Sequence, residues 1–445
     1  MRAPGASAAA AIDAATPPQR DRYLDALRVA AIAMVILGHW MVRVVTAPDS
    51  APEAGYLLLL APHWQWATLL WQVMPVFFFV GGRVNAESWR RARADGQAPA
   101  LWMRRRARRL LCPVLALLAV LLPAAALVHA VAGADALIFD FGVAVFPLWF
   151  LAAYLAVTAL TPLTLALHEQ GHGTLLLGGC VALALAVDLL RFTLEGPYLG
   201  TQPAVGGINF VLVWVAIHQI GYLWADDRLP ARPARQALMA LAGVAALALM
   251  IGSGLYPLTM VPIEGTTRPN NGSPPSGALI ALGLVQLGCA LLCRGPVTRL
   301  LRRPIIWAPV ALAGGQIITL FLWHQAAMLA VANTAYPAGL MPLTETVDAR
   351  WWATRPIWLG LCAVVLAAVA YVMRRFDAPP PGTPPGGPWR SGLGVVLFGG
   401  GVAGLIATRL FQESMPLSLP WPAILAVTAG MAALGVFGRR PAARD

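Results

Sequence analysis

Long apolar segments recur along the whole chain, and each is long enough to cross a lipid bilayer. A transmembrane helix needs about 20 mainly apolar residues, because the hydrocarbon core is about 30 Å thick. Twelve such segments lie near residues 24–46, 66–85, 109–131, 145–168, 173–191, 207–225, 236–257, 277–293, 309–332, 356–373, 391–410 and 419–437. Of the 445 residues, 58% are hydrophobic and only 12% are charged. We therefore predict an all-α, polytopic transmembrane bundle of about 12 helices.

The arginines predict how these helices are oriented. All 32 basic residues are arginine, because the chain contains no lysine. If the N-terminus is cytoplasmic, 25 arginines fall on the cytoplasmic side and Arg28 lies within a helix. The other six are Arg43, Arg191, Arg268, Arg350, Arg355 and Arg409. This asymmetry follows the positive-inside rule, so both termini are predicted to be cytoplasmic. The net charge of +12 then reflects topology and does not indicate a nucleic-acid partner.

Composition divides the chain into five parts. They are a disordered cytoplasmic tail (1–22), a ten-helix membrane domain (23–375), a Pro/Gly-rich cytoplasmic linker (376–390), two additional transmembrane helices (391–438) and a cytoplasmic tail (439–445). The first part has no uninterrupted apolar stretch, so no cleavable signal peptide is expected. The predicted location is the plasma membrane, which the chain crosses many times.

Two ionisable residues share one face of the first predicted helix. Arg28 and His39 are eleven residues apart, which is about three turns plus 20° and about 16 Å along the axis. An ionisable group inside the bilayer costs about 2.5 to 3.5 kcal/mol on insertion scales, so such a face is expected to meet polar groups. For each residue alone, a structural role explains the sequence as well as a functional one does: Arg28 as a snorkelling arginine and His39 as a packing histidine. Their alignment favours a functional face.

Two further histidines lie within apolar segments. His324, in TLFLWHQ, is predicted at the same depth as His39 on another helix, so the two side chains can converge. No metal site is predicted, because no carboxylate or third histidine has a matching depth. His218 lies nearer the cytoplasmic half, where a packing role and a functional role are equally compatible with the sequence. Histidine suits general-base chemistry near neutral pH, such as removing the proton of a hydroxyl during acyl transfer.

An arginine cluster precedes and opens the third predicted helix. It comprises Arg104, Arg105, Arg106, Arg108 and Arg109 in the segment LWMRRRARRLLCP. Guanidinium groups at such spacings suit a polyphosphate, because each binds phosphate oxygens in a bidentate manner. The alternative is a topology anchor that binds anionic lipid headgroups, and composition alone favours this second interpretation.

Several segments, in this order, resemble the acyltransferase 3 family of membrane-bound O-acyltransferases. They are LDALRVAAIAMVILGHW, PVFFFVGG, the arginine cluster, PLWFLAAYLAVTALTPL and TLFLWHQ, within about residues 20–375. The segments NFVLVWVAIHQIGYLWAD, YPLTMVPIEG and NNGSPPSG are similar to an actinobacterial branch of that family. Where the family often has Ser-Gly in the second helix, this chain has Gly81-Gly82. In place of an esterase-like soluble domain there are two more helices, so domain context does not indicate the acceptor.

The resemblance implies a ten-helix core that takes an acyl group, often acetyl, from cytoplasmic acyl-CoA. The acceptor would be a hydroxyl of a carbohydrate or other cell-envelope molecule. By position, Arg28 and His39 match the family's essential arginine and histidine. The cytoplasmic arginine pair of the family matches Arg106 and Arg109, or almost as well Arg105 and Arg108, and would contact the CoA phosphates. Trp149 and Phe150 match a segment expected, together with His218, to line the acceptor or acyl channel.

The leading hypothesis is therefore an acyl-CoA-dependent membrane O-acyltransferase without a bound cofactor. His39 would act as general base or as a transient acyl carrier, Arg28 would position the donor, and His324 is a secondary catalytic candidate. The oligomeric state is not predicted.

Two other classes of protein fit parts of the sequence. A multi-pass transporter would also have twelve spans and Gly/Pro-interrupted helices. Against it, the two halves show no internal repeat, and Asp188 is the main carboxylate within the membrane. A scaffold that only binds envelope intermediates would not need Arg28 or His39.

Overall fold

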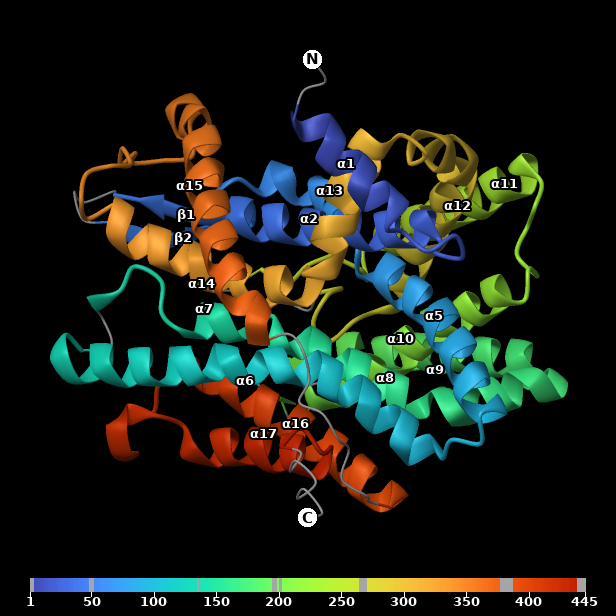
Figure 1. The fold of residues 1–445 in the computed structure, drawn as a ribbon. Helices are drawn as coiled ribbons and strands as arrows, with labels where there is room; N and C mark the ends of the chain where they lie inside the picture. The colour runs from blue at the N-terminus through green and yellow to red at the C-terminus, as the bar shows by residue number, and fades with distance from the viewer. Residues whose placement is uncertain are drawn as a thin grey trace, which may run out of the picture. The chain divides into compact units, whose positions relative to one another are not determined.

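A computed structural model describes residues 4–47, 52–133, 136–193, 198–199, 202–263, 270–376 and 387–437. Helices form almost all of its regular structure (Figure 1). They are α1 (Pro4–Ala14), α2 (Arg22–Val42), α3 (Leu57–Leu60), α4 (Thr68–Trp71), α5 (Met74–Ala94), α6 (Pro99–Val131), α7 (Gly142–Val145), α8 (Leu148–Leu167), α9 (Gly173–Thr193), α10 (Asn209–Ala225), α11 (Pro233–Gly252), α12 (Gly277–Leu300), α13 (Pro304–Gly315), α14 (Ile317–Ala335), α15 (Ala349–Met373), α16 (Pro388–Thr408) and α17 (Trp421–Ala433). A π-helical turn, His168–His172, joins α8 to α9.

The described strands form two short antiparallel hairpins. In the first, β1 (Arg43–Thr46) pairs with β2 (Glu53–Tyr56), and Arg43 lies opposite Tyr56. In the second, β3 (Tyr198–Leu199) pairs with β4 (Gln202–Pro203). Since β1 directly follows α2, the first hairpin forms the connection between α2 and the next helical segments.

The prediction of a helical, multi-pass membrane protein is confirmed, with only the two short hairpins as sheet among the described residues. Ten helical segments in the described residues are long and apolar enough to cross a membrane. One of them, Gly142–Thr193, has 52 residues and contains two of the predicted segments. The apolar helices α13 and α17 are shorter than a full span. Each of the twelve predicted segments overlaps a helix, while the number of crossings and the side of the termini remain predictions.

Several helices differ from the sequence prediction. The segment predicted as one helix over 309–332 is broken into α13 and α14, because two glycines end α13 and Gln316 has non-helical φ −118° and ψ 19°. Helix α6 begins ten residues before the predicted start, with proline in its first turn. Residues 4–14 form helix α1, packed against α13, where a disordered tail was expected. Most of the predicted linker, and the last tail, lie outside the described residues.

The chain forms two compact units, each described separately below. The first comprises residues 1–35, 63–87 and 163–317, and the second comprises 36–62, 88–162 and 318–445. In the first unit, α11 packs along α12 and α9 packs along α10. In the second, α16 and α17 form an antiparallel pair beside α6 (Figure 1).

Two glycines let α5 and α10 cross at backbone contact in the first unit. A Cβ on Gly82 would lie 2.1 Å from the carbonyl oxygen of His218, and a Cβ on Gly221 would lie 2.3 Å from that of Phe79. On either side of this crossing, aromatic rings stack in parallel, Phe78 on Trp214 and Phe79 on Trp224, with centroids 4.4 and 4.6 Å apart. Only glycine fits at this crossing.

A buried ion pair anchors the segment after residue 270 in the first unit. Arg191 Nε lies 3.3 Å from Asp188 Oδ1, and both side chains are fully buried. The guanidinium donates to the carbonyl oxygens of Asn270 and Pro274, at 2.6 and 2.7 Å. Asp188 accepts from the Gly277 amide at 2.7 Å. The main carboxylate that the sequence places within the membrane is therefore engaged in structural contacts.

Tyr256 and Asn209 complete the surroundings of this carboxylate. Tyr256 donates its hydroxyl to Asp188 Oδ2 at 3.1 Å, and Asn209 Nδ2 donates to Oδ1 at 3.0 Å. Burial and the neighbouring Asp188 carboxylate raise the pKa of Tyr256 above its ordinary value, so the phenol stays protonated and keeps donating.

We expect Asp188→Ala to destabilise the protein by about 3–5 kcal/mol, because it leaves the Arg191 charge buried without its partner. Thermal unfolding of the purified protein in detergent, followed by tryptophan fluorescence, measures the effect. The exposed Asp95 serves as the matched control, and Asp95→Ala is expected to change the midpoint little. Equal midpoints for the two variants would contradict the assignment of Asp188 as a structural anchor.

Glycines also set the packing of α16 against α17 in the second unit. A Cβ on Gly401 would lie 2.6 Å from the amide nitrogen of Val427, and one on Gly430 would lie 2.5 Å from that of Phe398. Arg409, just past α16, forms an ion pair with Asp140 at 2.6 Å. These contacts join the two additional helices to each other and to the segment before α7.

Candidate active site

His39 and His324 meet in the second unit. His39 lies in the last turn of α2 and His324 near the middle of α14. His39 Nδ1 is 2.8 Å from His324 Nε2, and the two rings are nearly parallel, with centroids 5.1 Å apart and an interplanar angle of 12°. His324 is fully buried, whereas His39 is half-buried. The structure thus brings together the two histidines that the sequence placed at one depth.

The hydrogen bonds assign a tautomer to each ring. His324 Nδ1 lies within hydrogen-bond distance of the Phe321 carbonyl oxygen, which only accepts, so Nδ1 carries a proton. Nε2 of the neutral His324 ring is then an acceptor, and His39 Nδ1 must be the donor between the two rings. The second nitrogen of His39, Nε2, is left with a lone pair. Among the described residues it has no hydrogen-bond partner, so it is available as a proton acceptor.

Two tryptophans hold the histidine pair through the backbone. Trp40 Nε1 donates to the carbonyl oxygen of His324 at 2.9 Å, and Trp358 Nε1, on α15, donates to that of Trp40 at 2.8 Å. Both tryptophans are buried, at 2% and 1% exposure. These bonds tie α2, α14 and α15 together at the level of the two imidazoles.

A buried arginine lies on the far side of Trp358. The guanidinium carbon of Arg355 is 4.0 Å from the ring centre of Trp351 and 5.5 Å from that of Trp358. Its Nη2 donates to Tyr336 Oη at 3.2 Å and to Thr354 Oγ1 at 3.0 Å. Cation–π contact with two indoles stabilises a charge that is only 3% exposed.

Aromatic side chains border the histidines. Phe146 meets the His39 ring edge to face at 6.5 Å, and Phe150 on α8 meets Phe321 in the same way at 5.3 Å. Trp149 is half-buried and lies edge to face with Phe150. Phe150 contacts Phe321, and Phe321 in turn contacts His324. This arrangement forms an apolar wall beside the polar pair.

Arg28 is placed apart from the histidine pair, in the first unit and nearer the start of α2. Its Nη1 lies 3.6 Å from Asp25 Oδ1, one turn earlier on the same helix. Asp25 also pairs with Arg20 at 2.5 Å. The side chain of Arg28 remains 37% exposed, so its guanidinium is accessible to a ligand.

The arginine cluster lies on α6, within the helix and not in the loop before it. Arg104 and Arg108 are buried, at 3% and 4% exposure, whereas Arg105 and Arg109 are exposed. Arg106 is half-buried, with its guanidinium carbon 5.5 Å from the Trp102 ring centre. Of the two candidate pairs, Arg106 with Arg109 presents two accessible guanidinium groups, and Arg105 with Arg108 presents one.

His218 lies in the first unit, where it is buried beside Asn85. Its Nε2 is 3.1 Å from Asn85 Nδ2, and its ring meets Tyr222 edge to face at 5.0 Å. These neighbours come from α5 and α10, next to the close crossing at Gly82. The contacts are those of a packed, hydrogen-bonded histidine.

In the part of the chain that the structure describes, no group of three or more His, Cys, Asp or Glu side chains is close enough to share a metal ion. What the histidine pair presents chemically is a proton acceptor, His39 Nε2, held in place by a second imidazole.

A family model described as an acyltransferase domain matches residues 21–374, most of the chain. The chain belongs to the acyltransferase 3 family. The family that the ordered motifs indicated is therefore confirmed, and this acyltransferase 3 protein is a membrane acyltransferase. Searches of curated proteins and of solved structures find no significant match.

The residues that support the pair in this acyltransferase 3 protein were missed by the sequence analysis. Trp358 and Trp40 act through backbone carbonyls, for which the sequence carries no signal. A signal did exist for Arg355, which was counted only as an outer-side arginine. Trp351 and Trp358 lie four residues before it and three after it, the helical spacings at which side chains meet.

Proposed function

We propose that this protein is an O-acyltransferase that moves an acyl group, acetyl in the first instance, from cytoplasmic acyl-CoA to a hydroxyl of a cell-envelope carbohydrate. The single observation that carries the proposal is the histidine pair, in which His39 Nε2 is free to accept a proton. Family membership supports acyl transfer in general. The donor, the acetyl group and the acceptor are proposed from the resemblance described above.

In the proposed reaction, His39 Nε2 removes the proton of the acceptor hydroxyl while the hydroxyl oxygen attacks the thioester carbonyl carbon. The resulting imidazolium keeps donating from Nδ1 to His324 Nε2, which stabilises its charge and orientation. When the tetrahedral intermediate collapses, the C–S bond breaks and Nε2 returns the proton to the departing CoA sulfur. The products are an ester and free CoA thiol, and His39 is again neutral.

The arginines are proposed to hold the donor. Arg28 lies about 16 Å before His39 along α2, a separation suited to orienting the long arm or phosphates of acyl-CoA rather than its carbonyl. Arg106 and Arg109 are proposed to bind the CoA phosphates, because both are accessible on α6. Trp149 and Phe150 are proposed to line the acyl or acceptor path.

The test is transfer of label from acyl-labelled acetyl-CoA in membranes that contain the protein. We expect label in a glycan fraction, released by mild base as expected for an ester, together with one CoA thiol per acyl group transferred. Membranes without the protein are the control. Thiol release without labelled product, or uptake of a solute without acyl-CoA, would contradict the proposed function.

Replacing Arg109 by glutamine is expected to raise the KM for acetyl-CoA about tenfold with little change in kcat, because a charged hydrogen bond to phosphate contributes to binding in both ground and transition states. Initial rates at varied acetyl-CoA concentration measure this. The exposed Arg235, on α11, is the matched control, and Arg235→Gln should leave the KM unchanged. A lower kcat at unchanged KM would contradict a phosphate contact.

A further inference from the structure

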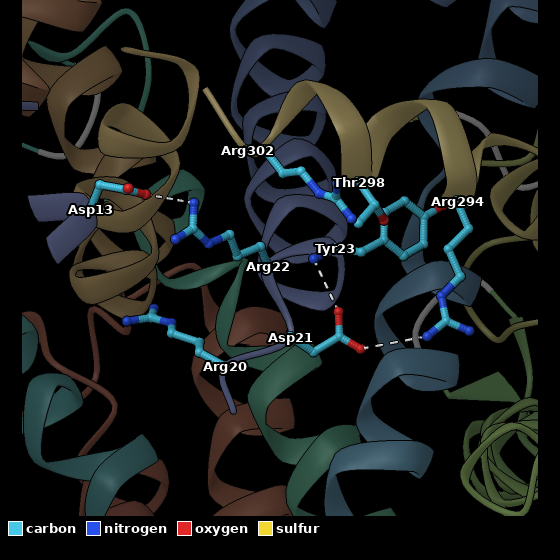
Figure 2. A pocket seen from close by; sticks show the side chains of 8 residues that line it. All are labelled: Asp13, Arg20, Asp21, Arg22, Tyr23, Arg294, Thr298 and Arg302. Atoms are coloured by element: carbon cyan, nitrogen blue, oxygen red, sulfur yellow. Dashed lines mark hydrogen bonds and ion pairs between the residues drawn. The ribbon is translucent and has the colours of Figure 1, made fainter. Parts of the chain in front are cut away.

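A basic cavity lies in the first unit at the start of α2 and the end of α12 (Figure 2). Its volume is about 450 Å³, within the range of small-molecule sites. The lining consists of Asp13, Arg20, Asp21, Arg22, Tyr23, Arg294, Thr298 and Arg302. Four arginines and two aspartates give this lining a net charge of +2. None of these residues belongs to the arginine cluster on α6 or to the histidine pair.

The aspartates do not neutralise the arginines around this cavity. Asp21 is shared by Arg294 and Arg83, with N–O distances of 3.9 and 3.7 Å. Asp25, just outside the lining, is shared by Arg20 and Arg28. A carboxylate that contacts two guanidinium groups cancels only one positive charge, so the positive potential persists.

Asp21 is further committed to the start of α2. Its Oδ1 accepts from the amides of Tyr23 and Leu24, at 3.0 and 3.1 Å, which caps the helix. Asp13 pairs with Arg22 at 2.6 Å, and Arg22 also donates to the Leu301 carbonyl oxygen at 3.0 Å. The acidic side chains therefore position the helix end and one arginine.

Arg302 differs from the other arginines of the lining, because no acidic side chain pairs with it among the described residues. Among the described residues, its side chain has neither a hydrogen bond nor an ion pair, and the Thr298 hydroxyl likewise has no hydrogen bond. Figure 2 shows Arg302 directed toward Thr298 and Tyr23 across the cavity. A guanidinium without a partner beside a hydroxyl offers several hydrogen bonds to one anionic group.

We propose that this cavity binds a phosphate ester through Arg302, Arg294 and Thr298. Phosphate suits the site better than carboxylate, because its tetrahedral oxygens can accept from Arg302, Arg294 and Thr298 in different directions. A nucleotide-bearing donor and an anionic lipid headgroup both present this group. The first source rests on the proposed function, and the second does not.

The test uses the full-length protein in nanodiscs of phosphatidylcholine, with adenosine 3′,5′-bisphosphate as the soluble probe. Calorimetric titration should show that Arg302→Gln weakens its binding tenfold or more. Arg303→Gln is the matched control, because Arg303 is adjacent and exposed but does not line the cavity. The affinity of this variant for the nucleotide should stay within twofold of wild type. Arg302→Lys should recover part of the loss, which separates charge from folding.

A second arm uses nanodiscs with phosphatidylglycerol and counts lipids retained by the purified protein in native mass spectrometry. Weaker nucleotide binding by Arg302→Gln supports the site and assigns it to a soluble phosphate ester. Loss of retained phosphatidylglycerol with unchanged nucleotide binding supports the site and assigns it to a headgroup. If neither changes, the proposal is overturned. Wild-type protein that binds the nucleotide but transfers no acyl group would refute the proposed function and leave this site standing.

Discussion

Replacing His39 by alanine is expected to lower kcat for acyl transfer by about 10²–10⁴-fold, the usual contribution of a positioned general base. The imidazole is the only described group at the pair with a free proton-accepting nitrogen, because both nitrogens of His324 are engaged. His39 is half-buried and not fully buried, so a substrate can approach its imidazole. Membranes supplied with labelled acetyl-CoA measure the rate.

The exposed His63 provides the matched control for this loss. His63→Ala removes an imidazole from the surface and should leave the rate within twofold of wild type. Both variants must be recovered at wild-type levels, as judged by size-exclusion chromatography. Undiminished transfer by His39→Ala would rule out its proposed role.

His324 is expected to behave as a positioning residue. His324→Ala should lower kcat by a smaller factor than His39→Ala, and should leave the KM for acetyl-CoA nearly unchanged, because its ring orients His39 and contacts no substrate in the proposed step. If His324→Ala abolished transfer while His39→Ala retained it, the two roles would have to be exchanged.

The second large effect is expected from Gly82→Ala, which should prevent recovery of folded protein. The added methyl would meet the His218 carbonyl oxygen at 2.1 Å, and a backbone atom inside α10 cannot turn away. Relief requires α5 and α10 to separate, which would disrupt the stacked Phe79 and Trp224 rings. We expect a cost of at least about 3 kcal/mol, at the upper end of overpacking effects.

The control for this substitution is another helical glycine of the same unit. Nothing lies within 4 Å of a Cβ built on Gly178 in α9, so Gly178→Ala should be neutral or should stabilise the helix by up to about 1 kcal/mol. The monodisperse fraction and the unfolding midpoint in detergent compare the two variants. A wild-type midpoint for Gly82→Ala would mean that the helices do not cross at backbone contact.

The sequence predicts best those features that depend on one element at a time. Apolar runs of bilayer length identify the helices, because a backbone in lipid must satisfy its own hydrogen bonds. The convergence of His39 and His324 was also within reach, since a fixed rise per residue converts sequence position into depth. The position of Arg106 inside α6 was not foreseen, because arginines raise the polarity of a segment without ending its helix.

Features that depend on contacts between distant segments were beyond the sequence. The pairing of Asp188 with Arg191 is a local spacing, but its bonds to Asn270 and Gly277 join residues about 80 to 90 positions apart. The basic cavity combines the N-terminal segment with the end of α12, and no periodicity within either segment signals it. The break at Gln316 depends on two glycines that an apolar helix could also have absorbed.

The tautomer of His324 is decided by a main-chain oxygen. Because every residue type presents the Phe321 carbonyl, side-chain substitution at position 321 leaves that acceptor in place, and alanine scanning would report the proton arrangement of the site as insensitive to this position. Only a change of the polypeptide backbone itself would weaken it. The backbone of α14 thus decides which nitrogen of His39 accepts a proton. A list of essential side chains would omit this determinant of the site.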